Sequence, residues 1–310
     1  MKQRENIQPL NVEELVINWH VTEACNYKCQ YCYAKWNDKR NMKELIHHPE
    51  KAMELLSKLY DFFKTENLKN PLRSQMNWKS ARLNFAGGET LLYKDHIHQL
   101  IQEAKKIGFK VSIITNGSTL DPELIKKLAP YLSILGVSVD SNDLTTNNSI
   151  GRVDRKGNIL NTGDIVSNLS LARSINPNMD IKINSVINKF NFDEDMNEFI
   201  ASIAPDKWKV LQMLPIITSG LVITKAQYQT FVRNHQQHKN IMSVEDNKGM
   251  QGSYLMIDPL GRFFQNTEEL DEGYCYSSPI IEVSVASALS EVDFSVPKFS
   301  SRYNLNGKEV

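Results

Sequence analysis

Three cysteines near the start of the chain are the residues whose type and spacing best fit a chemical role. Cys25, Cys29 and Cys32 follow the pattern Cys-x3-Cys-x2-Cys, whereas the fourth cysteine, Cys275, lies far away in the sequence. Sulfur is a soft ligand that suits iron–sulfur clusters, which normally take four thiolates. Three thiolates at these offsets in one loop predict a cubane iron–sulfur cluster in which one iron stays open to an external ligand.

Two other interpretations of the cysteines remain open at this point. The first is a zinc site completed by His20 or by a distant residue, although structural zinc usually has two separated Cys/His pairs instead of one tight triplet. The second is a set of three unrelated buried cysteines in a reducing compartment. The spacing favours the cluster, because such a triplet is rare by accident.

Polar and glycine residues end three of the predicted strands. Gly87 and Gly88 follow the strand Arg82–Ala86, and glycine lets a backbone approach a ligand closely, although an ordinary strand-to-helix turn explains the pair equally well. Asn116 follows the next strand, and Ser138 lies near the end of the one after it. Side chains at the carboxyl ends of barrel strands face the mouth where sites are assembled, and the alternative for each is a loop cap.

A second set of residues predicts an anion site. Period-two alternation places Lys182 and Asn184 on one strand face, and Lys207 and Lys209 on one face of the next strand. Ammonium groups that share one partly enclosed mouth need an anion, because buried unpaired charge is costly. Arg152 could add a two-donor clamp on a phosphate. The alternative is an ordinary salt bridge for each lysine.

The elements that position these residues alternate regularly. We expect strands at Val16–Val21, Arg82–Ala86, Lys110–Thr115, Ile134–Val139, Asp180–Val186 and Lys207–Gln212, with helices at Glu50–Lys64, Asp95–Ile107, Pro122–Leu128, Ile165–Ser174 and Glu194–Ala204. Such β-α alternation implies an α/β fold with parallel strands, either a barrel or a doubly wound sheet.

The alternation breaks after about residue 215. We expect a helix at Ala226–His238 and a β-hairpin made by Ser253–Asp258 and Arg262–Asn266, and the segment from Glu268 onward reads as irregular. The sequence therefore predicts a barrel core over residues 1–215 and an extension over residues 216–310. We expect the extension to pack on the barrel and to complete its site.

Composition limits the classes of protein to consider. The 310 residues include 36 Lys and Arg against 36 Asp and Glu, and 41% are hydrophobic, which excludes a disordered chain. Zero net charge argues against a polynucleotide partner, which needs a basic excess. No run approaches the ~18 apolar residues of a membrane span, and the N-terminus lacks a signal-peptide core. We therefore expect a cytoplasmic protein with no membrane partner.

The cysteine segment resembles that of the radical S-adenosylmethionine (SAM) enzymes. The resemblance lies in Cys25, Cys29 and Cys32 with the aromatic Tyr31 before the last cysteine, and in the glycine-rich segment Phe85–Glu89. It implies a partial (β/α)6 barrel, a 4Fe-4S cluster and S-adenosyl-L-methionine bound to the open iron. It also implies that Gly87, Gly88 and Glu89 lie at the methionyl amine, and that Asn116 and Ser138 contact the sugar and methionine parts of the cofactor.

Further resemblance covers most of residues 16–266 and lies in Ala86–Glu89, Ser138–Ser141, Gly151-Arg152, Lys182–Asn191, Trp208-Lys209 and Ser253–Leu255. These segments resemble the viperin family of radical SAM enzymes. Members convert a nucleoside triphosphate, CTP in the animal enzymes, to its 3′-deoxy-3′,4′-didehydro form, which terminates RNA chains. The resemblance implies substrate contacts at Arg82, Arg152, Lys182, Asn184, Lys207, Lys209, Tyr254 and Asn266. Asn266 stands where the animal proteins have a cysteine near the base, and prokaryotic members differ among CTP, UTP and GTP; we expect a pyrimidine, CTP or UTP. The resemblance also implies a role in antiviral defence, here against phage.

The mechanism implied by the resemblance is radical dehydration. A reduced cluster, supplied by a donor such as flavodoxin or ferredoxin, cleaves SAM to methionine and a 5′-deoxyadenosyl radical that takes hydrogen from ribose C4′. The 3′-hydroxyl then leaves as water, and one electron and one proton complete the product. Tyr254 is the candidate final hydrogen donor, with base stacking or packing as its alternative. Cys275 reads as a buried small side chain.

The sequence also leaves two alternative functions open. A radical SAM enzyme could act on another nucleotide such as GTP or on a different small molecule. Peptide-modifying relatives often carry further cysteine-rich cluster domains, and only Cys275 remains here for such a domain. A zinc-stabilised interaction protein without catalysis is the alternative from another class.

Overall fold

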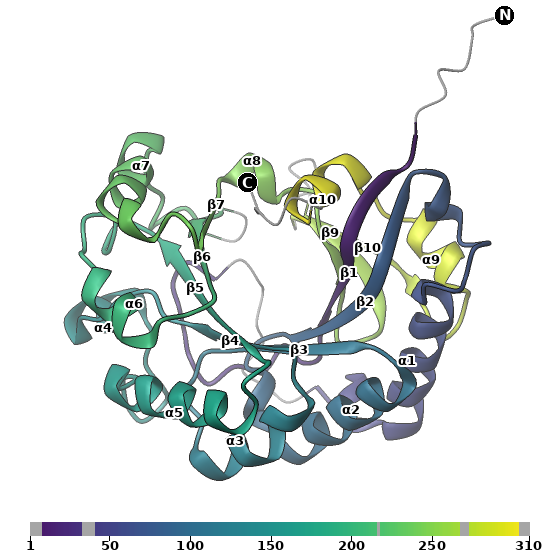
Figure 1. Ribbon diagram of the computed structural model, residues 1–310, viewed down its shortest axis with the longest axis horizontal. Coiled ribbons are helices and arrows are strands. Elements are labelled where there is room, and N and C mark those ends of the chain that lie inside the picture. Colours follow the sequence, from purple (N-terminus) through teal and green to yellow (C-terminus); the bar gives the residue numbers. More distant parts are fainter. Residues whose placement is uncertain (1–7, 33–40, 216–217, 267–272, 304–310) are drawn as a thin grey trace, which may run out of the picture.

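The computed structural model describes residues 8–32, 41–215, 218–266 and 273–303. In these residues one sheet of ten strands runs in the order β10-β9-β8-β1-β2-β3-β4-β5-β6-β7. Strands β1 to β7 pair in parallel with their sequence neighbours, β8 pairs in parallel with β1, and β9 and β10 add an antiparallel edge. The sheet curves into an open crescent with α1 to α6 along its outer side (Figure 1). The predicted α/β partial barrel is therefore confirmed, and it is not closed.

The elements follow the predicted order in the first two thirds of the chain, with two differences. Strands β1 and β2 begin six residues earlier than predicted, and helix α4 was not predicted. The strands are β1 Leu10–His20, β2 Met76–Ala86, β3 Lys110–Thr115, β4 Ile134–Ser138, β5 Asp180–Ile187, β6 Lys207–Gln212, β7 Met242–Glu245, β8 Leu255–Ile257, β9 Arg262–Asn266 and β10 Tyr274–Pro279. The helices are α1 Pro49–Phe63, α2 Lys94–Ile107, α3 Pro122–Leu128, α4 Leu144–Ile150, α5 Thr162–Ile175, α6 Asn197–Ile203, α7 Lys225–Asn234, α8 Asn247–Met250, α9 Val285–Ser290 and α10 Val296–Arg302.

Local signals in the sequence explain several helix ends. The Asp121 side chain accepts a hydrogen bond from the backbone N–H of Leu124, with proline at the start of α3, so this helix begins where the cap and the fixed proline φ favour it. Helix α2 ends at Gly108, whose φ of 117° is left-handed and suits glycine. The inward faces of these helices pack on strands whose residues are mostly buried.

The last third of the chain differs from the prediction. The short strand β7 was missed, and the predicted helix Ala226–His238 is instead α7 followed by a separate 3-10 turn at Gln236–His238. The segment from Glu268 onward is not irregular where it is described, because it forms β10, α9 and α10. Residues 267–272 and 304–310 lie outside the described residues. The predicted hairpin is confirmed, since β8 and β9 pair antiparallel.

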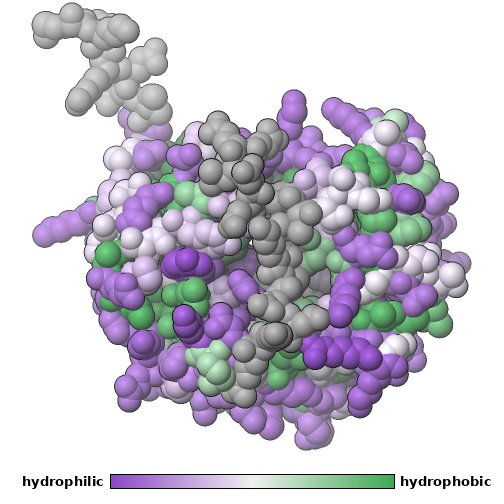
Figure 2. All heavy atoms as spheres, turned by 180° about the vertical axis from the view of Figure 1, so that it is seen from behind, coloured by the Kyte–Doolittle hydropathy of each residue, from purple (hydrophilic) through white to green (hydrophobic). Residues whose placement is uncertain are grey.

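The described part of the chain contains no helix with the length and apolar character of a membrane span. On the face drawn in Figure 2, small groups of hydrophobic residues are interspersed among hydrophilic ones. The sheet runs on from β6 into β7, so the division at residue 215 stays a prediction.

Candidate active site

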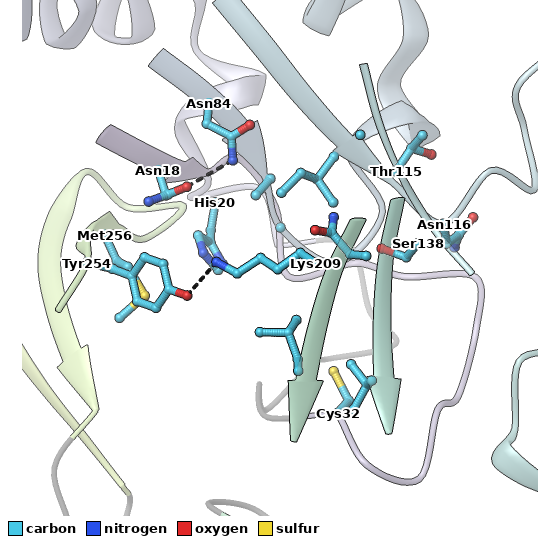
Figure 3. Close-up of a pocket in the computed structure, with 18 of the residues that line it drawn as sticks. Asn18, His20, Cys32, Asn84, Thr115, Asn116, Ser138, Lys209, Tyr254 and Met256 are labelled. Carbon is cyan, nitrogen blue, oxygen red and sulfur yellow. Dashed lines mark hydrogen bonds between the residues drawn. The ribbon is translucent and has the colours of Figure 1, made fainter. Parts of the chain in front are cut away.

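A cavity of about 300 Å³ lies inside the curve of the sheet. This size is at the lower end of the range for small-molecule sites. Its wall includes nearly all of the predicted site residues, namely Cys25, Cys29, Tyr31, Cys32, Arg82, Gly87, Gly88, Asn116, Ser138, Arg152, Lys182, Asn184, Lys209, Tyr254 and Asn266. Figure 3 shows Cys32, Asn116 and Ser138 at one side of this space and Lys209 and Tyr254 at another.

The cysteine loop is held in place by backbone contacts with the end of α4. The N–H of Lys28 donates to the carbonyl of Gly151 at 3.3 Å, and the N–H of Gln30 donates to the carbonyl of Ile150 at 2.9 Å. Within the loop, the N–H of Cys32 donates to the carbonyl of Cys29 at 3.1 Å. These bonds turn the loop so that all three cysteines border the cavity as partly exposed thiols, with no disulfide among the described cysteines.

The chemistry of this donor set fits an iron–sulfur cluster with three protein ligands. Soft sulfur donors suit such clusters, and all three thiols reach one cavity. Burial raises the pKa of the Cys25 thiol to about 12, so a cluster bound there would displace the thiol proton to solvent as the thiolate ligates iron. Among the described residues, no group of three Cys, His, Asp or Glu side chains already stands together as a metal site. The thiols thus share a cavity without being preassembled.

Gly87 and Gly88 pack the end of β2 against the cysteine loop. The N–H of Gly88 donates to the carbonyl of Thr22 at 2.8 Å. A Cβ on Gly88 would lie 2.1 Å from the carbonyl oxygen of Ala24, and Gly87 has a φ of 146°. Both positions therefore need glycine, because the loop backbone occupies the space that a side chain would fill.

Glu89 lies outside the cavity wall and is hydrogen-bonded to the backbone of Asn116, which is part of the wall. Glu89 is fully buried, and its carboxylate accepts from the Thr115 hydroxyl at 2.6 Å and the Asn116 N–H at 2.7 Å. Burial raises the pKa of this carboxyl. The Asn116 amide nitrogen donates to the side chain of Asn26 at 2.9 Å, which ties β3 to the cysteine loop. Glu89 is not part of the cavity wall, whereas Asn116 and Ser138 are.

Arg152 lies at the cysteine end of the cavity. It is buried, donates to the Asp140 carboxylate at 3.2 Å and to the Tyr31 hydroxyl at 3.1 Å, and reaches the carbonyl of Ser138. The Tyr31 hydroxyl also donates to Asp140. The sequence had grouped Arg152 with the lysines, and the structure places it instead against Tyr31, where Asp140 balances its charge.

The basic end of the cavity comes from β2, β5 and β6. Lys182, Asn184 and Lys209 all border the cavity, as alternation predicts. Arg82 also borders it, but its guanidinium pairs with Glu14 and donates to Ser112 at 2.7 Å. Lys207 differs from the expectation. It is not part of the cavity wall, its side chain is 42% exposed, and its ammonium lies 3.3 Å from the Asp180 carboxylate.

Residues after position 240 complete the wall. The Tyr254 hydroxyl accepts from the Lys209 ammonium at 2.9 Å (Figure 3) and donates to Glu245 at 2.5 Å. The Asn266 side chain borders the cavity and accepts from the N–H of Gly252 at 3.3 Å. Burial and the Glu245 charge raise the pKa of Tyr254 well above its usual value, so its hydroxyl stays protonated.

Sequence reasoning missed several residues of this site. Asn18 and Asn84 join by an amide hydrogen bond of 2.9 Å on the cavity wall. His20, considered from the sequence only as a zinc ligand, also borders the cavity, and burial lowers its pKa to about 4. Their place at inward positions of β1 and β2 was a usable signal. Glu245 and Arg302 were missed because their elements were not predicted. The Ser295 cap with proline close behind could have indicated α10.

The match to a family model and the matches to known protein sequences agree with each other. Residues 19–203 match the family model described as the Radical SAM superfamily. A protein of Pseudoalteromonas ulvae named S-adenosylmethionine-dependent nucleotide dehydratase is 42% identical over 297 residues, which is 96% of this chain and 95% of that protein. Proteins of the same name from Psychrobacter lutiphocae and a Fibrobacter strain are 40% and 37% identical, over 94% and 95% of this chain and over 95% and 89% of their own lengths.

Solved structures share the fold at low identity. A structure described as native anSMEcpe with bound AdoMet has a TM-score of 0.65 and 15% identity, and the match covers 92% of this chain and 84% of that one. Streptococcus suis SuiB bound to S-adenosylmethionine has a TM-score of 0.62 and 14% identity, over 94% of this chain and 68% of that one. At this identity the likeness supports the partial-barrel fold alone.

Proposed function

The chain belongs to the viperin-like S-adenosylmethionine-dependent nucleotide dehydratases of the radical SAM superfamily, and from this premise we propose that it dehydrates CTP or UTP to the 3′-deoxy-3′,4′-didehydro form as a defence against phage. The family makes the protein an enzyme that uses a 4Fe-4S cluster and SAM on a nucleotide substrate. The zinc-stabilised interaction protein is thereby set aside. The choice of base and the role in defence are the parts proposed here.

The observation that carries the proposal is one continuous cavity bordered by two unlike sets of residues. Three thiols stand on its wall together with Gly87, Gly88, Asn116 and Ser138, and Lys182 and Lys209 stand on the same wall. A cavity that offers thiols and ammonium groups together suits a redox cofactor beside an anionic substrate.

The cofactor end is proposed to hold the cluster on Cys25, Cys29 and Cys32. When bound, cluster and SAM supply the one-electron chemistry that removes hydrogen from ribose C4′. Gly87 and Gly88 keep the backbone close, and Asn116 and Ser138 face the cofactor. Tyr31 and Glu89 support this end through Asp140 and the Asn116 N–H. Arg152, buried among these groups, is proposed to act here and not on the triphosphate.

The basic end is proposed to hold the triphosphate. Lys182 and Lys209 supply ammonium groups, Asn184 supplies an amide beside them, and Arg82 adds a third cation whose charge Glu14 partly balances. Lys207 contributes at most to the field of the site, because it pairs with Asp180 outside the wall. This arrangement positions C4′ between the two ends and excludes water from it.

The remaining parts of the proposal concern the last third of the chain. Residues 216–310 are proposed to complete the nucleotide site, because Tyr254, Met256 and Asn266 all border the cavity from this segment. Asn266 can both donate and accept, so it could read the edge of a pyrimidine. Tyr254 keeps its proton and is proposed to supply the final hydrogen as a proton to the departing 3′-hydroxyl, while the one electron comes from a flavodoxin or ferredoxin in the cytoplasm.

The test is a competition among CTP, UTP, GTP and ATP with the reduced, reconstituted enzyme and SAM. Mass spectrometry should find one pyrimidine triphosphate lighter by one water, with one 5′-deoxyadenosine formed for each product. The matching nucleoside without phosphates serves as the control and should give little 5′-deoxyadenosine. Dehydration of GTP or ATP in place of CTP and UTP would overturn the choice of base, and equal output with the nucleoside would overturn the triphosphate site.

A further inference from the structure

Four side chains from distant parts of the chain meet at one wall of the cavity. They are Lys209 of β6, Glu245 at the end of β7, Tyr254 just before β8, and Arg302 at the end of α10. We call these four residues the Glu245 cluster. The side chains of Lys209, Glu245 and Arg302 are 11%, 8% and 8% exposed. Such burial makes every unpaired charge among them costly.

Glu245 is the centre of this cluster. Its Oε1 lies 2.5 Å from the Lys209 ammonium and 2.6 Å from the Arg302 guanidinium, and its Oε2 accepts from the Tyr254 hydroxyl at 2.5 Å. Burial alone would raise the pKa of Glu245, but the two cations hold it at about 2. The carboxylate is therefore charged at neutral pH and binds all three partners.

Arg302 fixes the other side of Tyr254. Its guanidinium donates to the Tyr254 hydroxyl at 2.5 Å and lies 4.1 Å from the centre of the tyrosine ring, and it also donates to the carbonyl of Gly249. The Lys209 ammonium lies 5.0 Å from the same ring centre. Tyr254 is thus enclosed by two cations and one carboxylate, which leave its hydroxyl a single orientation.

Two of the four residues border the cavity and two do not. Lys209 and Tyr254 stand on the wall, whereas Glu245 and Arg302 lie behind them. Two cations on one carboxylate leave one excess positive charge, which suits an incoming anion. We propose that Glu245, together with Arg302, is a positioning element that holds the Lys209 ammonium and the Tyr254 hydroxyl toward the substrate. This inference rests on the proposed function. It implies that α10, which carries Arg302, contributes to the substrate site.

The experiment compares Glu245→Gln with a matched control. The control is Asp258→Asn, because Asp258 is also a buried carboxylate on an arginine, at 2.6 Å from Arg262, but it is not part of the cavity wall. For each reconstituted variant, calorimetry measures the nucleotide dissociation constant, and chromatography measures 5′-deoxyadenosine per dehydrated nucleotide.

In Glu245→Gln we expect the nucleotide dissociation constant to change less than severalfold, because losing the contact that positions Lys209 and removing a nearby negative charge act in opposite directions. The ratio of 5′-deoxyadenosine to product should rise about tenfold, since Tyr254 loses its fixed orientation. Asp258→Asn should keep the wild-type ratio. If Glu245 were only a structural counter-ion, binding would weaken and both outputs would fall in parallel at an unchanged ratio, which would overturn the inference.

Arg302→Met is a second test of the inference. It should weaken nucleotide binding and raise the same ratio, and the double variant Glu245→Gln/Arg302→Met should be less impaired than the product of the two single effects, because the two residues act as one unit. Strict additivity would contradict this. Absence of dehydrated product from the wild-type enzyme with every nucleotide would overturn the proposed function itself, whereas wild-type turnover with an unchanged Glu245→Gln ratio would overturn this inference alone.

Discussion

The two ends of the cavity are built in different ways. The cysteine end is held by backbone hydrogen bonds and close glycine packing within short loops, as in the bonds from Lys28 and Gln30 to the end of α4. The lysine end is held by ionic side chains that come from elements far apart in sequence, with Glu245 between Lys209 and Arg302. The first end depends mainly on backbone shape, beside one buried ion pair of Arg152 with Asp140, and the second depends on charge balance, so they should fail under different perturbations.

The largest expected effect is on the cysteine end. Cys29→Ser should abolish dehydration, because an alcohol is a poor replacement for a thiolate on iron. Iron and acid-labile sulfide measured after anaerobic reconstitution should fall to background. Cys275→Ser is the matched control, since Cys275 lies in β10 and is not part of the cavity wall. A Cys29→Ser protein that kept a full cluster would contradict the assignment of the ligands.

Gly88→Ala tests the claim that this end depends on shape. The new Cβ would lie 2.1 Å from the Ala24 carbonyl oxygen, so the cysteine loop must shift. We expect the free energy of unfolding to fall by about 3 kcal/mol, together with a lower cluster content. Denaturant unfolding and iron analysis measure the two.

Gly220→Ala is the control for that experiment, because the nearest atom to a Cβ there is at 3.7 Å and the residue is exposed. It should change the free energy of unfolding by less than about 0.5 kcal/mol. Equal stability of Gly88→Ala and wild type would show that the loop has room to spare and that the comparison of the two ends is wrong.

Acid should act on the lysine end. The pKa of Glu245 is about 2 in the folded protein and near 4.5 when unfolded, so the folded state favours the charged form. This stability is fully present above pH 4.5 and is lost as pH falls from there toward 2. Glu245→Gln lacks this pH dependence. Between pH 5 and pH 2.5 the free energy of unfolding of wild type should therefore fall by about 2 kcal/mol more than that of the variant.

Urea unfolding at a series of pH values measures that difference. The comparison of wild type with Asp258→Asn should give the opposite sign, because burial raises the pKa of Asp258 in the folded protein. Its charged form then destabilises the folded state, so the free energy of unfolding of wild type should fall relative to that of Asp258→Asn as pH rises. If the free energy of unfolding fell equally with decreasing pH in wild type and in Glu245→Gln, the carboxylate would not bind its two cations in solution.

The two ends also differ in how much the sequence predicts. Cys25, Cys29 and Cys32 lie within eight residues, and the strands and helices around them follow regular alternation, so spacing and periodicity were sufficient to place them. Beyond residue 215 the helix near α7 and the hairpin were predicted, but β7 has four residues and carries too little periodicity to be predicted, and only the Ser295 cap indicates α10. Glu245 and Arg302 therefore could not be placed, because their partnership arises only when β7 and α10 reach the same wall.

Paired lysines on neighbouring strands show the same limit on a smaller scale. Alternation predicts Lys182 and Lys207 as inward residues, and the two stand opposite each other in the β5–β6 register. Alternation cannot predict where the cavity ends along a strand. Lys207 is the first residue of β6 and has Asp180, the first residue of β5, within 3.3 Å, so solvent and a carboxylate already satisfy it.

This pair gives the smallest of the predicted effects and the sharpest comparison. Lys182→Ala should weaken nucleotide triphosphate binding about tenfold, in keeping with the loss of one charge-assisted hydrogen bond, while the cluster content stays unchanged. Lys207→Ala should change binding less than about twofold, because an exposed, paired ammonium contributes little. Calorimetric titration of both variants under identical salt measures the difference. Equal weakening by the two substitutions would mean that the triphosphate reaches the start of β6, and that the charge-balanced end of the cavity extends beyond the wall described here.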